Sequence, residues 1–245
     1  MHRFFIDRSI QTSEVSLEGK EWHHCQTVLR AEKGDRLVIF DGMGSEYIAE
    51  LIEASRKTGR LRIVQKEVTP RPPYSITLAQ SLPKNKIMDF IVQKATELGV
   101  QQLIPMFSER SSVRPKENEA ESKVARWKEI TIESAKQCGL NWLPSVTYPK
   151  SFREVIEISS NFRFKYVGSL QPDAKPLWCY QEALPRNLEP ILLMIGPEGD
   201  LTLEELSIAQ NAGFYPLSLG PLVLRCDTAV IYSISTLCYE LQRSR

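Results

Sequence analysis

The sequence is poor in the residues that form disulfides or bind metals. Its 245 residues include five cysteines and three histidines, and no two cysteines have C-x-x-C spacing. An odd number of cysteines without such a framework predicts reduced thiols and a cytoplasmic protein. The adjacent residues His23 and His24 lack the spacing of a chelating pair, so we expect no metal site.

Long apolar runs and an excess of one charge are also missing. No apolar run approaches the ~20 residues that span a bilayer, and because of the charges at Arg3 and Asp7 we expect no signal peptide. We therefore expect no membrane association. Lys and Arg number 31 against 30 for Asp and Glu. Any nucleic acid must then be bound through a local basic patch, not through the whole surface.

A proline-rich segment at residues 69–73 divides the chain, because proline interrupts helices and central strands. The sequence predicts one domain over residues 1–72 and a second over residues 73–245. Short apolar runs separated by turn residues indicate that the first domain is a small β-barrel. Its expected strands lie at 4–6, 36–40, 47–51 and 61–64, with one helix at 21–29.

Strand and helix patterns alternate after the proline-rich segment, which favours an α/β domain with a parallel sheet and helices on its faces. Thr202 and Glu205 form a capping box, and Asp227 is the expected N-cap of the last helix. The expected strands are 75–82, 103–107, 164–167, 191–195 and 214–219, and the expected helices are 85–98, 122–138, 202–213 and 227–241.

Residues 37–57 allow two interpretations. An apolar run followed by Gly42 and Gly44 resembles the start of a dinucleotide-binding unit, with a helix over 46–57. That unit needs a third glycine where Tyr47 stands, and without it the helix cannot pack closely on the strand. We favour a β-hairpin that turns at residues 41–44.

Two segments near the C-terminus combine glycine and proline directly after an apolar run. Residues 195–200 read I-G-P-E-G-D, and residues 219–229 read L-G-P-L-V-L-R-C-D-T-A. Glycine lets backbone groups approach a ligand closely, and proline makes the turn rigid. Placed side by side, two such loops would grip a small flat ligand through backbone atoms.

These loops resemble the C-terminal signature of the SPOUT methyltransferases, and most closely the 16S rRNA (uracil-N3)-methyltransferase family of the RsmE type. Further motifs of that family stand at residues 28–42, 94–100, 107–110 and 133–139, so the resemblance covers nearly the whole chain. It implies a SPOUT-type parallel sheet with a C-terminal trefoil knot and an N-terminal PUA-like RNA-binding barrel. It also implies S-adenosylmethionine as cofactor and a homodimer as working unit.

The implied reaction is methylation of N3 of a uridine in 16S rRNA, either naked or within the assembled small subunit. Two alternatives stay open: a non-catalytic RNA-binding ribosome-assembly factor on the same fold, and methylation of tRNA ribose by a related knotted enzyme.

The chain departs from the family pattern at four positions. Leu222 and Leu140 stand where the family usually has arginine, which motivates the alternative of an assembly factor. Asp227 replaces a glutamate. Asp200 replaces a glycine, and we expect it in the first turn of a helix, where an acid suits the dipole.

Methylation at N3 requires the uracil to lose a proton. A nearby cation can stabilise the resulting anion and a carboxylate can accept the proton. We expect Arg225 in the first role and Asp227 or Glu198 in the second. Alternatively, Asp227 only caps its helix and Glu198 only bonds backbone. Cys226 is expected to be a packed thiol, because this chemistry needs no covalent adduct.

The remaining expected site residues fall into two groups. Cofactor contacts are expected from Leu170, Met194, Gly196, Pro197, Glu198, Gly199, Leu219, Gly220 and Leu224. RNA contacts are expected from Arg8 and Arg30 in the first domain and from Lys84, Lys94 and Arg110 in the second.

Overall fold

The computed structural model describes residues 2–72, 74–84, 87–111, 114, 116–185 and 189–243. Its contacts divide the chain into two compact units, Met1–Arg71 with Ile132–Leu143, and Pro72–Thr131 with Pro144–Arg245. The segment 132–143 thus groups with the first unit, although the sequence predicted it within the second domain. Among the described residues, no helix has the length and apolar character needed to cross a membrane.

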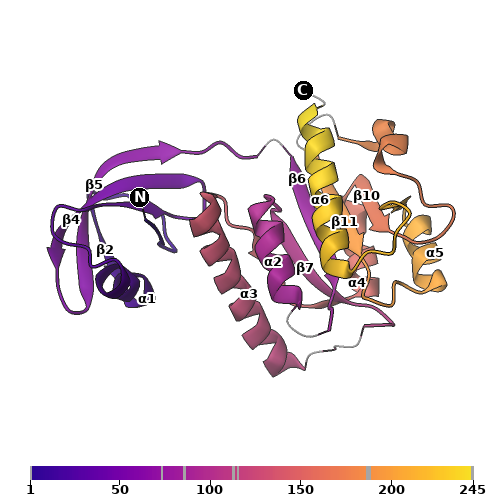
Figure 1. Ribbon diagram of the computed structural model, residues 1–245, viewed down its shortest axis with the longest axis horizontal. Helices are drawn as coiled ribbons and strands as arrows, with labels where there is room; N and C mark the ends of the chain where they lie inside the picture. The colour runs from indigo at the N-terminus through magenta and orange to yellow at the C-terminus, as the bar shows by residue number, and fades with distance from the viewer. Residues whose placement is uncertain are drawn as a thin grey trace. The chain divides into compact units, whose positions relative to one another are not determined.

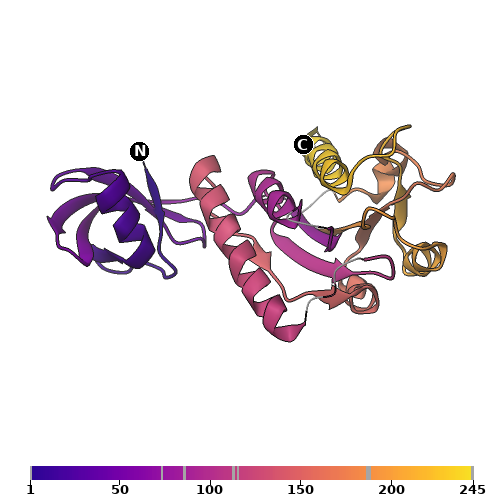
Figure 2. The same cartoon turned by 60° about the horizontal axis from the view of Figure 1, so that its bottom comes forward.

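The first unit is built on a curled five-stranded sheet with α1 (Gly19–His23) beside it (Figure 2). The strand order is β1-β3-β4-β5-β2, with β1 parallel to β3 and the other neighbours antiparallel. A π-helical segment, His24–Val28, extends α1. The strands are β1 (Arg3–Phe5), β2 (Glu14–Glu18), β3 (Arg36–Phe40), β4 (Ser45–Ala54) and β5 (Thr58–Val68).

The hairpin interpretation of residues 37–57 is confirmed. Strands β3 and β4 pair antiparallel. Asp41 Oδ1 closes the turn between them by accepting from the amides of Met43 at 2.8 Å and Ser45 at 3.0 Å. Strand β2 was not predicted, because only Val15 and Leu17 alternate into the core there.

The segment 132–143 is held in the first unit by polar and aromatic contacts. The Arg3 guanidinium donates to Asn141 Oδ1 at 2.5 Å, and Trp142 Nε1 donates to the Thr69 carbonyl at 3.0 Å. The Trp142 ring also occupies the space that a side chain at Gly44 would need. These contacts explain why the segment groups with residues far from it in sequence.

The second unit contains a parallel sheet with the strand order β12-β10-β11-β6-β7-β8. Figure 1 labels its strands β6, β7, β10 and β11. A short strand, β9 (Lys150–Ser151), also pairs with β7. The other strands are β6 (Ser75–Ser81), β7 (Gln102–Phe107), β8 (Ser145–Val146), β10 (Phe164–Gly168), β11 (Pro190–Ile195) and β12 (Tyr215–Leu217).

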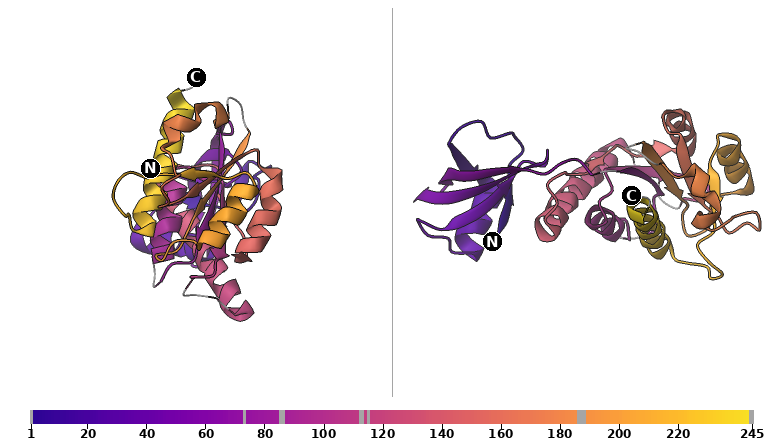
Figure 3. Two further views of the ribbon diagram at one scale, coloured as in Figure 1. Left: turned by 90° about the vertical axis from the view of Figure 1, so that its right-hand side faces the viewer. Right: turned by 90° about the horizontal axis from the view of Figure 1, so that it is seen from above.

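Helices cover both faces of this sheet (Figure 3, left). Helices α2 (Ile87–Glu97) and α6 (Cys226–Arg243) pack on one face, while α4 (Phe152–Ile158) and α5 (Leu203–Asn211) pack on the other. Helix α3 spans Glu117–Cys138, and short 3₁₀ segments lie at Ser159–Asn161 and Leu177–Ala183. The expected α/β class is confirmed, and the knot stays a prediction.

The central strands are apolar on both faces because both faces are buried. In β6, Leu78 belongs to the core under α2 and α6, while its neighbour Ala79 belongs to the core under α4 and α5. All strands of a parallel sheet end at the same edge. The loops after β6, β7, β10 and β11 therefore meet at the carboxyl edge.

Candidate active site

A pocket of about 240 Å³ lies at the carboxyl ends of β10 and β11. Three loops line it, and both glycine–proline segments are among them. Of the expected cofactor residues, those that line the pocket are Leu170, Gly196, Pro197, Glu198, Leu219, Gly220 and Leu224. Met194 is instead fully buried in the core beneath α4 and α5, and Gly199 is absent from the lining.

Several lining residues were not among the expected cofactor contacts. Besides Arg225, which was expected in a catalytic role, they are Gly168, Ser169, Ile195, Asp200, Leu222, Val223, Cys226 and Ala229. Gly168 and Ser169 follow the expected strand 164–167 directly. The rule that parallel strands end at one edge would have indicated them, since β10 and β11 are neighbours.

The backbone of the second loop is available to a ligand. Gly220 has φ +104°, a conformation that side chains rarely adopt, and a Cβ there would meet no atom within 4 Å. The amides of Leu219, Gly220 and Leu224 donate to no partner within the described part of the chain. Three residues that line the pocket therefore have backbone donors available to a ligand.

Asp200 interacts with the backbone of two pocket loops. Its carboxylate accepts from the amide of Leu201 at 2.7 Å, and the amide of Leu170 also lowers its pKa. Burial raises the pKa of Asp200 above its usual value, and these amides and the Arg110 charge oppose the shift. Helix α5 begins only at Leu203, after the N-cap Thr202. The expectation that Asp200 lies in the first helical turn was therefore wrong.

Arg225 and Asp227 stand at the start of α6. The helix begins at Cys226, and the Arg225 carbonyl accepts from the Ala229 amide at 2.8 Å. Arg225 is thus the N-cap, and the expectation that Asp227 takes this position was wrong. The Arg225 side chain is 86% exposed, and its Nε lies 4.0 Å from Asp227 Oδ1. That oxygen is buried and accepts no hydrogen bond from the described residues.

Glu198 and Cys226 are less suited to catalysis than Arg225 and Asp227. Glu198 Oε1 accepts from the Lys84 amide at 2.8 Å, so this carboxylate already has a backbone partner. Burial, with the nearby charges of Glu198 and Asp227, raises the pKa of Cys226 to about 11. The buried thiol is therefore protonated at neutral pH and poorly suited to act as a nucleophile.

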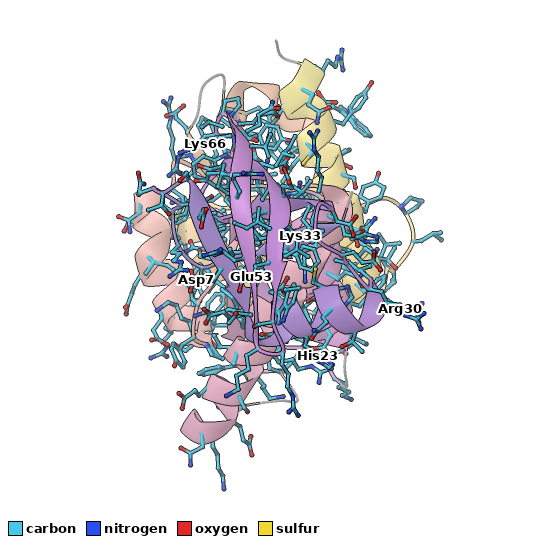
Figure 4. The ribbon with its side chains drawn as sticks, turned by 90° about the vertical axis from the view of Figure 1, so that its left-hand side faces the viewer. Asp7, His23, Arg30, Lys33, Glu53 and Lys66 are labelled. Carbon is cyan, nitrogen blue, oxygen red and sulfur yellow. The ribbon has the colours of Figure 1, made fainter. Side chains whose placement is uncertain are left out.

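The expected RNA contacts are spread over both units. Arg8 and Arg30 are exposed on the first unit, and Figure 4 shows the Arg30 side chain pointing outward. Lys84 is exposed in the loop after β6, at the edge of the sheet that carries the pocket. Lys94 lies in the last turn of α2, away from that edge, and its Nζ donates to both Glu97 carboxylate oxygens at 2.8 Å.

Comparison with known proteins identifies the family. Residues 70–238 match the family model of an RNA methyltransferase domain, and residues 17–64 match that of an RNA methyltransferase PUA domain. The ribosomal RNA small subunit methyltransferase E of Bacillus subtilis is 31% identical over 254 aligned positions, which cover 100% of this chain and 99% of the relative. The chain belongs to the ribosomal RNA small subunit methyltransferase E family.

Other members of the methyltransferase E family agree in sequence and structure. The Synechocystis protein is 34% identical, with 88% of this chain and 69% of the relative aligned. The crystal structure of the Neisseria gonorrhoeae protein, bound to S-adenosyl methionine, superposes with a TM-score of 0.86 at 31% identity. That match covers 97% of this chain and 96% of the Neisseria chain.

Proposed function

We propose that this chain transfers a methyl group from S-adenosylmethionine to N3 of a uridine in 16S rRNA. The observation that carries the proposal is the convergence of both glycine–proline loops on one pocket, with Arg225 at its rim. The family adds support, because its members are named for small-subunit rRNA and one was solved with this cofactor.

The residues of the pocket fit such a cofactor. The open amides of Leu219, Gly220 and Leu224 would hydrogen-bond its adenine, and the carboxylates of Glu198 and Asp200 would stabilise its positive charge. When bound, S-adenosylmethionine supplies an electrophilic methyl group on a sulfonium. Little acid–base help is needed on that side, so the pocket contributes mainly by positioning.

The acceptor base needs more help from the chain. The exposed guanidinium of Arg225 would bind a uracil carbonyl oxygen, where negative charge develops as N3 loses its proton. We assign the proton acceptor to Asp227, because its Oδ1 accepts no hydrogen bond from the described residues and lies 4.0 Å from Arg225 Nε. Glu198 is the weaker candidate, since its carboxylate already binds the Lys84 amide.

Mass-spectrometric mapping of 16S rRNA from cells that lack the protein tests this function. We expect one 3-methyluridine to disappear, and to return when the purified protein and S-adenosylmethionine are added. Naked 16S rRNA and small subunits, assayed in parallel, identify the substrate. Unchanged modification would favour an assembly factor, and loss of a tRNA ribose methylation would favour the related knotted enzymes.

Replacing Arg225 tests the mechanism. Arg225→Ala should lower kcat by about 10²-fold, the usual effect of losing one group that stabilises transition-state charge. Cofactor affinity, measured by calorimetry, should stay within about twofold, because the side chain is exposed. Leu222→Ala in the same loop is the matched control without a charge. An equal loss of turnover and cofactor affinity would instead indicate a structural role for Arg225.

We also propose a homodimer as the working unit. Helix α6 buries Val230, Ile234 and Leu237 in the core but leaves Tyr232 and Tyr239 exposed. Exposed aromatic side chains on one helix face are typical of protein interfaces. A second copy of the chain is the partner that we expect to cover them.

A further inference from the structure

Three hydrogen bonds tie the first glycine–proline loop and the start of α5 to the loops after β6 and β7. The Lys84 amide donates to Glu198 Oε1, the Arg110 Nη1 to the Gly199 carbonyl, and the Glu109 amide to Glu205 Oε1, each at 2.8 Å. The partners are 89 or more positions apart in sequence. The loops after β6 and β7 therefore help to fix the conformation of the first glycine–proline loop and of the start of α5.

Arg110 makes the most extensive of these connections. Its aliphatic stem covers Gly199, since a Cβ at that glycine would lie 3.7 Å from Arg110 Cδ and 3.8 Å from Arg110 Cβ. Its positive charge also opposes the rise in the pKa of Asp200 that burial causes. One side chain thus contacts the loop by packing, by a hydrogen bond and by charge.

The peptide bond between Gly199 and Asp200 is held at both ends. Its carbonyl accepts from Arg110, and its amide donates to the Pro197 carbonyl at 2.9 Å. Asp200 has φ +59°, which few residues other than glycine adopt. Fixing this peptide plane keeps Asp200 in that conformation. Glu198 and Asp200, on either side of Gly199, are the carboxylates that line the pocket.

We propose that Arg110 is a positioning residue for the cofactor loop. Its guanidinium clamps the Gly199–Asp200 peptide and thereby sets the two acidic side chains at the pocket wall. The inference rests on the proposed cofactor. It assigns Arg110 a role different from the RNA contact expected from the sequence. Substituting a residue that positions the cofactor loop changes cofactor affinity, whereas substituting an RNA contact changes the salt dependence of RNA binding.

Calorimetry with S-adenosylmethionine in the absence of RNA tests the assignment. Arg110→Met keeps much of the stem but removes the donor and the charge, and we expect cofactor affinity to fall about tenfold, as for loss of one charge-assisted bond. Arg110→Lys, which retains the charge and one donor, should recover part of the loss. Arg114→Met is the matched control. That arginine stands over the Phe107 ring in the same loop, 5.8 Å from its centroid, and the variant should bind like the wild type.

The salt dependence of 16S rRNA binding separates the alternatives. If Arg110 positions the cofactor loop, the slope of log affinity against log salt stays unchanged in Arg110→Met. Unchanged cofactor affinity with a slope reduced by about one would overturn the proposal and assign Arg110 to an RNA phosphate. If the wild type itself fails to bind S-adenosylmethionine, the proposed function fails first, and that result is distinct from a variant that binds normally.

Discussion

Asp200 adopts a backbone conformation that most side chains avoid. Its φ of +59° lies in the left-handed region, which costs an ordinary residue roughly 1–2 kcal/mol and aspartate less than most. The short carboxylate offsets part of this cost by accepting from the Leu201 amide. The family's usual glycine would adopt the same conformation without strain. The chain therefore gains a pocket carboxylate in exchange for backbone strain and partial burial of a charge.

Asp200→Asn should stabilise the chain at neutral pH. Burial raises the folded-state pKa of Asp200, so the folded chain retains the proton at a pH where the unfolded chain has lost it. The stability linked to this group is complete below the unfolded pKa and is lost as the pH rises through the folded pKa. Asparagine keeps the acceptor oxygen and tolerates positive φ. The gain in melting temperature should be largest at pH 7 and shrink toward pH 4. A gain that does not vary with pH would contradict this account.

The elements that could be predicted well are those determined by residues close to one another in the sequence. The capping box of α5 is observed, with the Glu205 amide donating to Thr202 Oγ1 at 3.1 Å. The start of α6 was misplaced because Asp227, a favoured N-cap residue, follows the true one closely. The grouping of residues 132–143 was not predictable. It depends on contacts such as Arg3 with Asn141, which are 138 positions apart.

Trp142→Ala should destabilise the first unit specifically. The Trp142 indole donates to the Thr69 and Pro70 carbonyls, and the Arg71 guanidinium stands 4.5 Å from its ring centroid. Losing this half-buried ring should lower the free energy of unfolding by about 2 kcal/mol.

Hydrogen exchange checks where the effect of Trp142→Ala falls. Amides of β3 and β4 should exchange faster, while those of β10 and β11 stay protected. Trp178→Ala is the control, because that indole is 65% exposed and should change stability by less than about 0.5 kcal/mol. Faster exchange in both sheets after Trp142→Ala would show that the segment supports the whole chain.

At the scale of the whole molecule, the fold class and the presence of a pocket could be predicted from the sequence. The residues that line the pocket could be predicted only in part. Alternating strands and helices indicate a parallel α/β sheet, and glycine–proline loops indicate a ligand pocket, because both signals are local. The sides of the pocket depend on which strands become neighbours. Gly168 and Ser169 line it only because β10 pairs with β11. Likewise, the contact of Arg110 with Gly199 appears only once β7 and β11 lie in one sheet.

The proposed homodimer gives the last test, and it concerns the outer face of α6. Tyr232 and Tyr239 are 47% and 65% exposed and lie two helical turns apart on one face. Light scattering should give the wild type about twice the 28.0 kDa chain mass. Tyr239→Glu should shift it toward the monomer, because a buried unpaired charge is costly. Tyr148→Glu, a 58% exposed tyrosine before β9, should leave the mass unchanged. A monomeric wild type at micromolar concentration would rule out this role for the α6 tyrosines.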